Sequence, residues 1–291
     1  MDKLNQQFRL IDGRRLGFAE YGSAHASPLI YLHGWPSSRL EPRAMGTVCE
    51  DLGIRMLAPD RPGYGLSDFQ SGRTILDFTN DVVQLADHLK LGQFGVLGVS
   101  GGGPYAVACA ARISQRLSAA LLVCSVAPAD APNATKDMVA LNRCLLWMAH
   151  HTPLLAQCVA RVCLRVIWRK GEHVIPKQIE LRLPPADRQA LASEHLRNAL
   201  IASSTEALRN GVRAAAADGL LYGRPWGFSL QDIRAPVHLW HGEKDIVVPA
   251  AMGHYLAEAI PDCQAHFYPD DGHFSLPFTR LREILQPIFS P

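Results

Sequence analysis

The 291-residue sequence predicts an α/β protein whose mainly parallel sheet is covered by helices on both faces. Short apolar runs without alternation recur in the first half of the chain and again near its end. Each run is bounded by turn residues, as buried parallel strands are. Segments with apolar residues at helical spacing separate the runs. A long stretch of helical pattern in the middle predicts an insertion into this series.

The order of the elements follows from these patterns. A hairpin opens the chain, with strands at 8–12 and 15–21 around Asp12-Gly13-Arg14. The buried strands are expected at 29–32, 54–58, 94–99, 117–126, 237–241 and 265–268. Helices are expected at 74–90, 102–113 and 250–259, with one more at the end of the chain.

The chain changes character between Ala127 and Arg234, where helical patterns replace strand-like runs. The helices expected there cover 138–150, 156–169, 186–202 and 205–217, and prolines punctuate them. We therefore expect a core of residues 1–126 and 235–291, with a helical cap of residues 127–234 over the carboxyl edge of the sheet.

Composition excludes several classes of protein. Lys and Arg total 29 against 27 Asp and Glu, a balance that predicts neither a nucleic-acid nor a membrane partner. No stretch approaches the roughly 18 to 20 apolar residues of a membrane span. The seven cysteines show no zinc spacing and no disulfide framework, which is typical of reduced thiols. The first residues lack the apolar core of a signal peptide, so we expect a cytoplasmic protein.

The strongest motif is GVSGG at 98–102, which matches G-x-S-x-G with Ser100 at its centre. An apolar strand precedes it and a helix rich in small residues follows it. In such a turn the serine hydroxyl is exposed at the sheet edge, and the glycines avoid clashes with the strand and the helix. The helix amino terminus also favours developing negative charge. The pattern therefore predicts Ser100 as a nucleophile.

Two other interpretations of this motif compete. Such pentapeptides occur by chance, so a glycine-rich turn with an incidental serine is one of them. Residues 101–106 also fit the dinucleotide pattern G-x-G-x-x-A. That pattern needs an acid at the end of the next strand, about 20 residues on. The next strand ends at Val126 and the first acid is Asp130, which disfavours nucleotide binding.

A serine hydroxyl becomes an effective nucleophile when a base takes its proton, and that base is usually an oriented histidine. The expected chain order is serine, acid, histidine, with the last two in loops after late strands. Asp245 follows the strand at 237–241, and His273 follows the strand at 265–268. We therefore expect Asp245 as the acid and His273 as the general base.

Other acids remain alternatives to Asp245. Glu243 lies in the same loop, and Asp130 follows the strand that ends at Val126. Asp270 and Asp271 adjoin the histidine, but neighbouring residues on a turn rarely point at one another.

An oxyanion formed by attack of Ser100 needs hydrogen-bond donors. The segment HGWP at 33–36 follows the strand at 29–32, so the backbone N–H groups of Trp35 and Gly101 are the expected donors. His33 is expected to hold this loop in place, and the turn at 60–67 is expected to be structural.

At these residues the sequence resembles the α/β-hydrolase superfamily, specifically its single-domain bacterial members with a helical cap. The matching segments are HGWPSS (33–38), PDRPGYGLSD (59–68), GVSGGGPYA (98–106), HGEKDIVVP (241–249) and DGHFS (271–275). The resemblance implies an eight-stranded, mostly parallel sheet with a cap after strand six, and neither metal nor organic cofactor. It carries over Ser100 as nucleophile, Asp245 as acid and His273 as base. Relatives with an Asp nucleophile, the epoxide hydrolases and haloalkane dehalogenases, differ at this position.

The activity expected from these residues is hydrolysis of an acyl compound, most simply a carboxylic ester, through an acyl-serine intermediate. The cap is rich in Leu, Val, Ala and Trp, including Trp147 and Trp168, which favours a small-molecule substrate with an apolar portion. A lactonase, a carbon–carbon bond hydrolase and a cofactor-free haloperoxidase are alternatives on the same triad.

Two further alternatives make different demands. A proline-releasing aminopeptidase needs acids in the cap to hold an amino terminus, and the acids available are Glu172, Glu180, Glu194 and Glu206. A non-catalytic ligand-binding protein, the alternative from another class, usually lacks part of the triad. The sequence does not indicate an oligomeric state.

Overall fold

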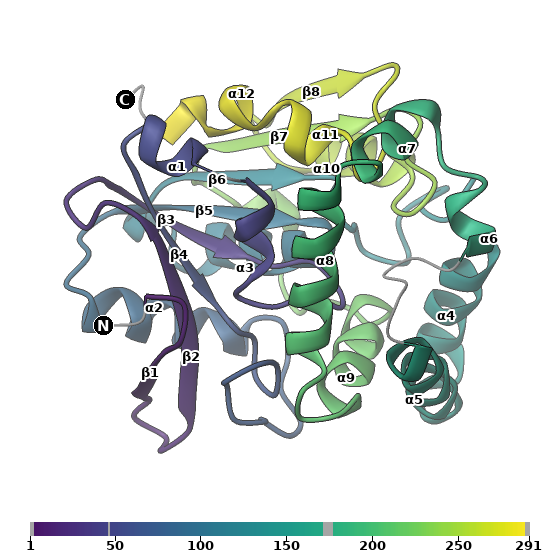
Figure 1. Ribbon diagram of the computed structural model, residues 1–291, viewed down its shortest axis with the longest axis horizontal. Coiled ribbons are helices and arrows are strands. Elements are labelled where there is room, and N and C mark those ends of the chain that lie inside the picture. The colour runs from purple at the N-terminus through teal and green to yellow at the C-terminus, as the bar shows by residue number, and fades with distance from the viewer. Residues whose placement is uncertain (1–2, 46, 171–176, 289–291) are drawn as a thin grey trace.

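The computed structural model describes residues 3–45, 47–170 and 177–288, with the backbone alone at 167–170 and 177–178. Its strands form one eight-stranded sheet in the order β1-β2-β4-β3-β5-β6-β7-β8 (Figure 1). The strands are β1 (Gln6–Arg9), β2 (Arg15–Gly22), β3 (Ser27–Leu32), β4 (Ile54–Pro59), β5 (Phe94–Val99), β6 (Leu117–Val123), β7 (Val237–Gly242) and β8 (Gln264–Tyr268). The β1–β2 and β2–β4 pairs are antiparallel and all other pairs are parallel, which confirms the predicted sheet.

The central strands are buried on both faces, which explains their unalternating apolar sequences. All six residues of β5 are buried. The first face packs against α2 (Asp77–His88), α3 (Gly103–Arg112) and α10 (Ala250–Ala259). The opposite face packs against α1 (Val48–Asp51) and α12 (Leu281–Leu285), with α11 (Leu276–Thr279) between β8 and α12 in the chain. Helices therefore cover both faces, as the sequence predicts.

Six α-helices lie between β6 and β7 in the described part of the chain, and we call them the insertion helices. They are α4 (Ala140–His151), α5 (Pro153–Lys170), α6 (Lys177–Glu180), α7 (Pro185–Leu191), α8 (Glu194–Ala207) and α9 (Arg213–Tyr222). Figure 1 shows them beyond the carboxyl ends of the parallel strands.

The predicted helices at 186–202 and 205–217 were wrong in their boundaries. The first is split at Ser193, whose side chain accepts a hydrogen bond from the Leu196 N–H and so caps α8. The second begins too early, because α8 continues to Ala207 and the chain then turns through Gly211 at φ 88° before α9. A continuous apolar pattern hid both breaks.

No helix among the described residues combines the length and the apolar character that a bilayer crossing requires. All seven cysteines are free thiols.

Candidate active site

Ser100 lies between β5 and α3, in a single turn that spans Ser100–Gly102. Its backbone has φ 54°, in the left-handed region that non-glycine residues rarely occupy. Strain of this kind persists only where the surrounding structure imposes it, and it is concentrated at functional sites. The turn leaves Ser100 half-buried, whereas Val99 and Gly101 on either side are buried.

The glycines of this turn are required by close packing of the main chain. A Cβ on Gly102 would lie 1.9 Å from the carbonyl oxygen of Leu32, at the end of β3. A Cβ on Gly98 would lie 2.7 Å from the carbonyl oxygen of Gly102. Both distances are too short for any side chain, so the strand, the turn and the helix meet only because these residues are glycine.

His273 and Asp245 are brought together by the loops after β8 and β7. The Nδ1 atom of His273 lies 2.7 Å from Oδ2 of Asp245, and both residues are buried. The other carboxylate oxygen of Asp245 accepts hydrogen bonds from the Val247 and Val248 N–H groups, each at 2.8 Å. The acid is therefore held in one orientation before any substrate binds.

This contact sets the proton distribution on His273. Because a carboxylate only accepts, Nδ1 carries the proton and Nε2 is free to act as a base. Burial disfavours the charged ring, but the charge and the hydrogen bond of Asp245 outweigh it and raise the pKa of His273. Asp187 and Glu41 raise this pKa further. The positively charged form of this imidazole is thus stabilised, as a general base requires.

The alternative acids lie elsewhere. Asp130 is exposed and forms no hydrogen bond or ion pair with any described residue. Glu243 pairs with His254 at 3.0 Å, and Asp270 pairs with Lys244 at 2.7 Å. Asp271 contacts Arg280 at 3.3 Å. Among the acids that the sequence left open, the structure brings only Asp245 to His273.

The predicted oxyanion donors flank Ser100 from two loops. The Trp35 N–H donates no hydrogen bond to any described residue, so it is available to a ligand. Gly101 is the second residue of the turn that starts at Ser100, where backbone N–H groups have no partner within the turn. A Cβ on Gly101 would lie 2.8 Å from Cβ of Trp35, so the two segments are in close contact.

His33 and Arg61 hold the loop that carries Trp35. The Arg61 N–H donates to Nε2 of His33, while Nδ1 of His33 lies 3.0 Å from the Gly34 carbonyl oxygen, so this histidine is a neutral Nδ1–H tautomer. Burial lowers the pKa of His33 well below its usual range, in agreement with that state. The Arg61 guanidinium also donates to the carbonyl oxygens of His33 and Gly34.

Arg61 is in turn paired with Asp218 of α9, at 2.7 Å. Arg73 donates to the other oxygen of the same carboxylate, and the hydroxyls of Tyr64 and Tyr105 donate to it as well. This cluster is buried, and it joins an insertion helix to the oxyanion loop. No local sequence pattern marks Asp218.

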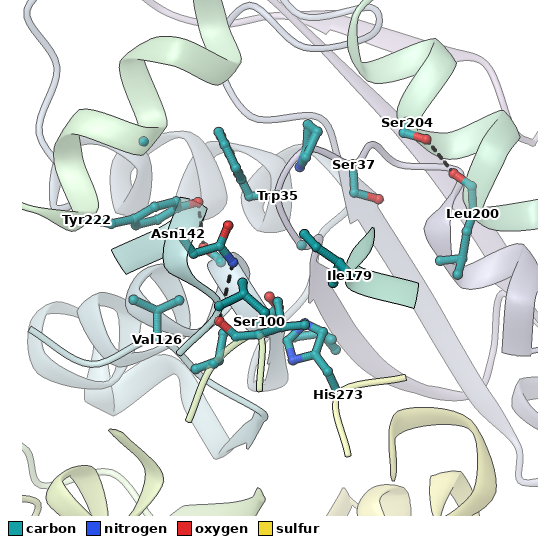
Figure 2. A pocket seen from close by; sticks show the side chains of 18 of the residues that line it. Trp35, Ser37, Ser100, Val126, Asn142, Ile179, Leu200, Ser204, Tyr222 and His273 are labelled. Carbon is teal, nitrogen blue, oxygen red and sulfur yellow. Dashed lines mark hydrogen bonds between the residues drawn. The ribbon is translucent and has the colours of Figure 1, made fainter. Parts of the chain in front are cut away.

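Ser100 and His273 both line a cavity of about 280 Å³ between the sheet edge and the insertion helices (Figure 2). No hydrogen bond joins them among the described contacts, which is common in enzymes without substrate. Most of the lining is apolar, and its aliphatic side chains include Leu145, Leu146, Leu164, Leu200 and Leu208. Trp147, expected to mark an apolar pocket, is instead 58% exposed, and the side chain of Trp168 lies outside the described residues.

Among the described residues that line the cavity, Glu41 alone has a carboxyl group. The sequence patterns did not identify it. Its Oε2 accepts a hydrogen bond from the Gly34 N–H at 2.7 Å, and burial raises its pKa. By occupying the Gly34 N–H, Glu41 orients the loop so that the next N–H, that of Trp35, remains free.

Asp187 of α7 was also missed. Its fully buried carboxylate accepts hydrogen bonds from three successive backbone N–H groups, those of His273 at 3.0 Å, Phe274 at 3.0 Å and Ser275 at 2.8 Å. A Cβ on Gly272 would lie 2.4 Å from Oδ2 of Asp187. An insertion helix thus fixes the main chain that carries the candidate base.

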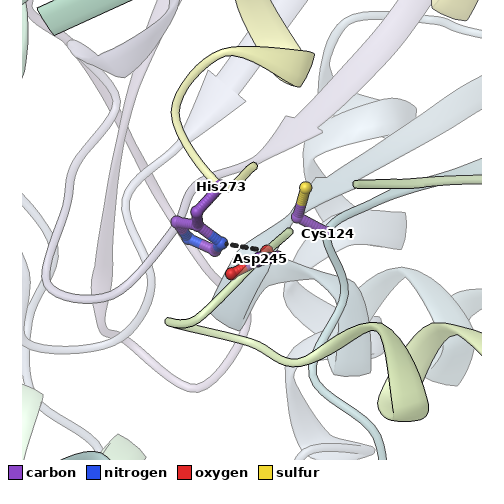
Figure 3. Close-up of side chains that lie close together, drawn as sticks. All are labelled: Cys124, Asp245 and His273. Carbon is purple, nitrogen blue, oxygen red and sulfur yellow. Dashed lines mark hydrogen bonds and ion pairs between the residues drawn. The ribbon is translucent and has the colours of Figure 1, made fainter. Parts of the chain in front are cut away.

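Cys124, at the end of β6, lies beside the Asp245–His273 pair (Figure 3). Their possible ligand atoms all lie within 4.8 Å of one another, which suits a metal ion in distance. Their chemistry does not suit one. Nδ1 of His273 is already engaged with Asp245, and burial together with the charge of Asp245 raises the pKa of Cys124 well above that of a free thiol.

Comparison with known proteins agrees with this architecture. The family model described as the alpha/beta hydrolase fold matches residues 27–144. An uncharacterized hydrolase of Bacillus subtilis is 28% identical over 115 residues, which cover 40% of this chain and 39% of that relative. A putative non-heme haloperoxidase of Mycobacterium phage D29 is 26% identical over 275 residues, covering 91% of this chain and 87% of the relative.

Among solved structures, an esterase from Exiguobacterium antarcticum superposes with a TM-score of 0.71 at 18% identity. The match covers 99% of this chain and 100% of the esterase. At this identity the likeness concerns the fold. Together with the eight-stranded sheet and the matched family model, it shows that the chain has the α/β-hydrolase fold.

Proposed function

We propose that this protein hydrolyses a carboxylic ester of a small molecule through an acyl-serine intermediate on Ser100. The observation that carries the proposal is the buried 2.7 Å contact between His273 and Asp245, in a loop that also lines the cavity containing Ser100. A strained serine, an oriented base and free backbone donors are the parts that acyl transfer needs.

The steps follow from this arrangement. Nε2 of His273 takes the proton of Ser100 as Oγ attacks the ester carbonyl carbon, and the resulting oxyanion binds the N–H groups of Trp35 and Gly101. The tetrahedral intermediate collapses with cleavage of the carbon–oxygen bond, and the imidazolium returns the proton to the leaving alcohol. A water molecule then repeats the sequence on the acyl-serine and releases the acid.

In this proposal residues 127–234 act as a cap on a core of residues 1–126 and 235–291. The aliphatic lining supplied by the insertion helices favours an acyl or alcohol group without charge. Glu41 adds a reason, because its carboxyl group near the oxyanion loop would repel a carboxylate on the substrate.

The aminopeptidase alternative finds little support. Glu180 pairs with Arg197, and Glu206 pairs with Arg39 and Arg209. Glu194 is exposed and Glu172 lies outside the described residues. The haloperoxidase name of one relative is compatible with the same three residues, so haloperoxidase activity is a second candidate function.

The test compares wild-type protein with Ser100→Ala on p-nitrophenyl esters from acetate to dodecanoate. We expect a loss on the order of 10⁴-fold or more in the variant, since the intermediate cannot form. Ser71→Ala, at an exposed turn, is the matched control and should retain full activity. The preferred chain length would report the size of the cavity.

A fluorophosphonate probe tests the nucleophile without a substrate. Labelling of wild type and of Ser71→Ala, but not of Ser100→Ala, is the expected pattern. Ester hydrolysis that survives in Ser100→Ala would overturn the proposal.

A further inference from the structure

Large apolar side chains are exposed mainly on one part of the molecule. Among the described residues, eight large hydrophobic side chains are exposed, and seven of them lie between 141 and 181. They are Leu141, Trp147, Leu154, Leu155, Val162, Val166 and Leu181. Most of these belong to α4 and α5, and Figure 1 shows α5 at the edge of the molecule beyond α9.

On α5 these side chains form one stripe. Leu154, Cys158, Val162 and Val166 follow one another at intervals of four residues, which places them along one side of a helix. Leu155 lies next to them. Leu154 is 82% exposed and Val162 is 58% exposed. We call these five residues the α5 stripe.

The opposite side of α5 is also apolar, and it is the side that packs inward. Ala160 and Leu164 are buried in a cluster with residues of α8 and α9. A surface helix normally pairs an apolar inward face with a polar outward face. Since α5 is apolar on both, its outward stripe has the composition of a contact surface.

The charge around the stripe indicates what it contacts. Between Met138 and Lys170 the sequence contains five Lys and Arg residues and no Asp or Glu, in contrast to the balanced chain as a whole. Arg161 and Arg165 form no hydrogen bond or ion pair with any described residue. Their guanidinium groups are therefore available to an external anion.

We propose that the α5 stripe docks on the surface of a membrane that contains anionic phospholipids, with α5 lying in the plane of the interface. Exposed Leu and Val side chains would enter the boundary of the acyl chains, and Arg161 and Arg165 would contact phosphate groups. Docking of a second copy of this chain is disfavoured, because it would bring two acid-free, positively charged surfaces together. The inference goes beyond the proposed function and does not depend on it.

The test is cosedimentation of the full-length protein with vesicles. One set contains phosphatidylcholine alone, and the other contains equal parts of phosphatidylcholine and phosphatidylglycerol. We expect binding to the anionic vesicles that weakens as salt is added, and much less binding to the neutral ones.

Two double variants separate the contributions. Leu154→Gln/Val162→Gln should lower the affinity for anionic vesicles by about 10- to 100-fold, because two apolar groups no longer enter the interface. Arg161→Gln/Arg165→Gln should lower it by roughly 10-fold and remove most of the salt dependence. Ile11→Gln is the matched control, since Ile11 is 94% exposed but lies in the turn between β1 and β2.

Circular dichroism and thermal unfolding of each variant establish that it is folded. Wild-type protein that stays in the supernatant with both vesicle types would overturn the proposal, as would equal loss of binding in Ile11→Gln. A wild-type dimer in sedimentation velocity that Leu154→Gln/Val162→Gln converts to a monomer would assign the stripe to self-association instead.

Discussion

The insertion helices fall into two groups that are held to the sheet in different ways. Each of α7, α8 and α9 is joined to a loop of the candidate site by buried polar groups. Asp187 binds the backbone at His273, Ser203 binds Ser37 and Ser38, and Asp218 binds Arg61. By contrast, the side chains of α5 that the structure describes form no hydrogen bond or ion pair, and Ala160 and Leu164 hold it to α8 and α9 by apolar packing.

This difference separates two roles within one insertion. Polar anchors have strict geometry, so they can fix the distance between a helix and a catalytic loop. Apolar packing tolerates small displacements, and it leaves the outer side of a helix free to meet another surface. We infer that α7, α8 and α9 complete the candidate active site, whereas α5 closes the cavity from outside. Helix α4 is intermediate, since Asn142 donates a hydrogen bond to the Val247 carbonyl oxygen in the loop that carries Asp245.

The largest effect is expected for Asp218→Asn. The substitution keeps the shape of the side chain but leaves Arg61 and Arg73 buried without their counter-charge. We expect the free energy of unfolding to fall by about 3–5 kcal/mol. Urea denaturation measures this, with Arg165→Gln on α5 as the control, for which a change within about 0.5 kcal/mol is expected. Equal stability of the two variants would remove the distinction between the two groups of helices.

Asp187→Asn should act on catalysis. In either orientation of the asparagine amide, its NH2 group would face a backbone N–H donor. The loop at His273 should therefore shift. We expect kcat for an ester to fall on the order of 10²-fold, because a displacement of a reacting group by about 1 Å has an effect of that size. The KM should change little, because Asp187 does not line the cavity.

The same variant should change the pH dependence. The charged groups that face His273 are Asp245, Asp187 and Glu41, and each raises its pKa. Loss of the Asp187 charge lowers the pKa of His273, so the base stays unprotonated to lower pH. The acidic limb of kcat/KM should therefore move to lower pH. Glu194→Gln, at an exposed acid in the first turn of α8, should leave the limb in place. A limb that moves to higher pH in Asp187→Asn would contradict this account.

The smallest effect is expected for Ser203→Ala. The Ser203 hydroxyl lies 2.8 Å from Oγ of Ser37 and accepts from the Ser38 N–H at 3.0 Å, all of them buried. Its removal should lower the free energy of unfolding by about 1–2 kcal/mol, since a buried N–H loses its acceptor. Ser204→Ala is the matched control, because that hydroxyl binds only carbonyl oxygens of its own helix. Thermal melts of the two variants that coincide would show that α8 has no polar anchor at this position.

Local sequence patterns were sufficient to predict the sheet, and they named the three residues of the candidate triad, of which the structure joins Asp245 to His273. Buried parallel strands have continuous apolar sequences, and Ser100, Asp245 and His273 each follow such a strand directly. Asp187, Asp218 and Glu41 could not be found in this way. Asp187 lies 86 residues from His273 in the chain, and Asp218 lies 157 residues from Arg61, so no local spacing marks them. Their roles depend on how the insertion helices dock.

The same limit explains the misplaced expectation for Trp147. Composition shows that an insertion is rich in apolar residues, but a helix that is apolar on both sides does not reveal which side faces the cavity. On α4, Leu145 and Leu146 line the cavity, whereas the adjacent Trp147 is exposed. Tertiary packing therefore decides what periodicity leaves open.

The contacts at Gly98 and Gly102 have a consequence for how this gene can vary. Every amino-acid replacement of a glycine adds at least a Cβ, and at these two positions that atom would lie 2.7 Å and 1.9 Å from main-chain oxygens. A backbone oxygen cannot rotate away as a flexible side chain does. We therefore expect no substitution to be tolerated at either position, and both glycines should be invariant in any collection of active random mutants. The aliphatic side chains that line the cavity can replace one another, so such a collection should diverge there.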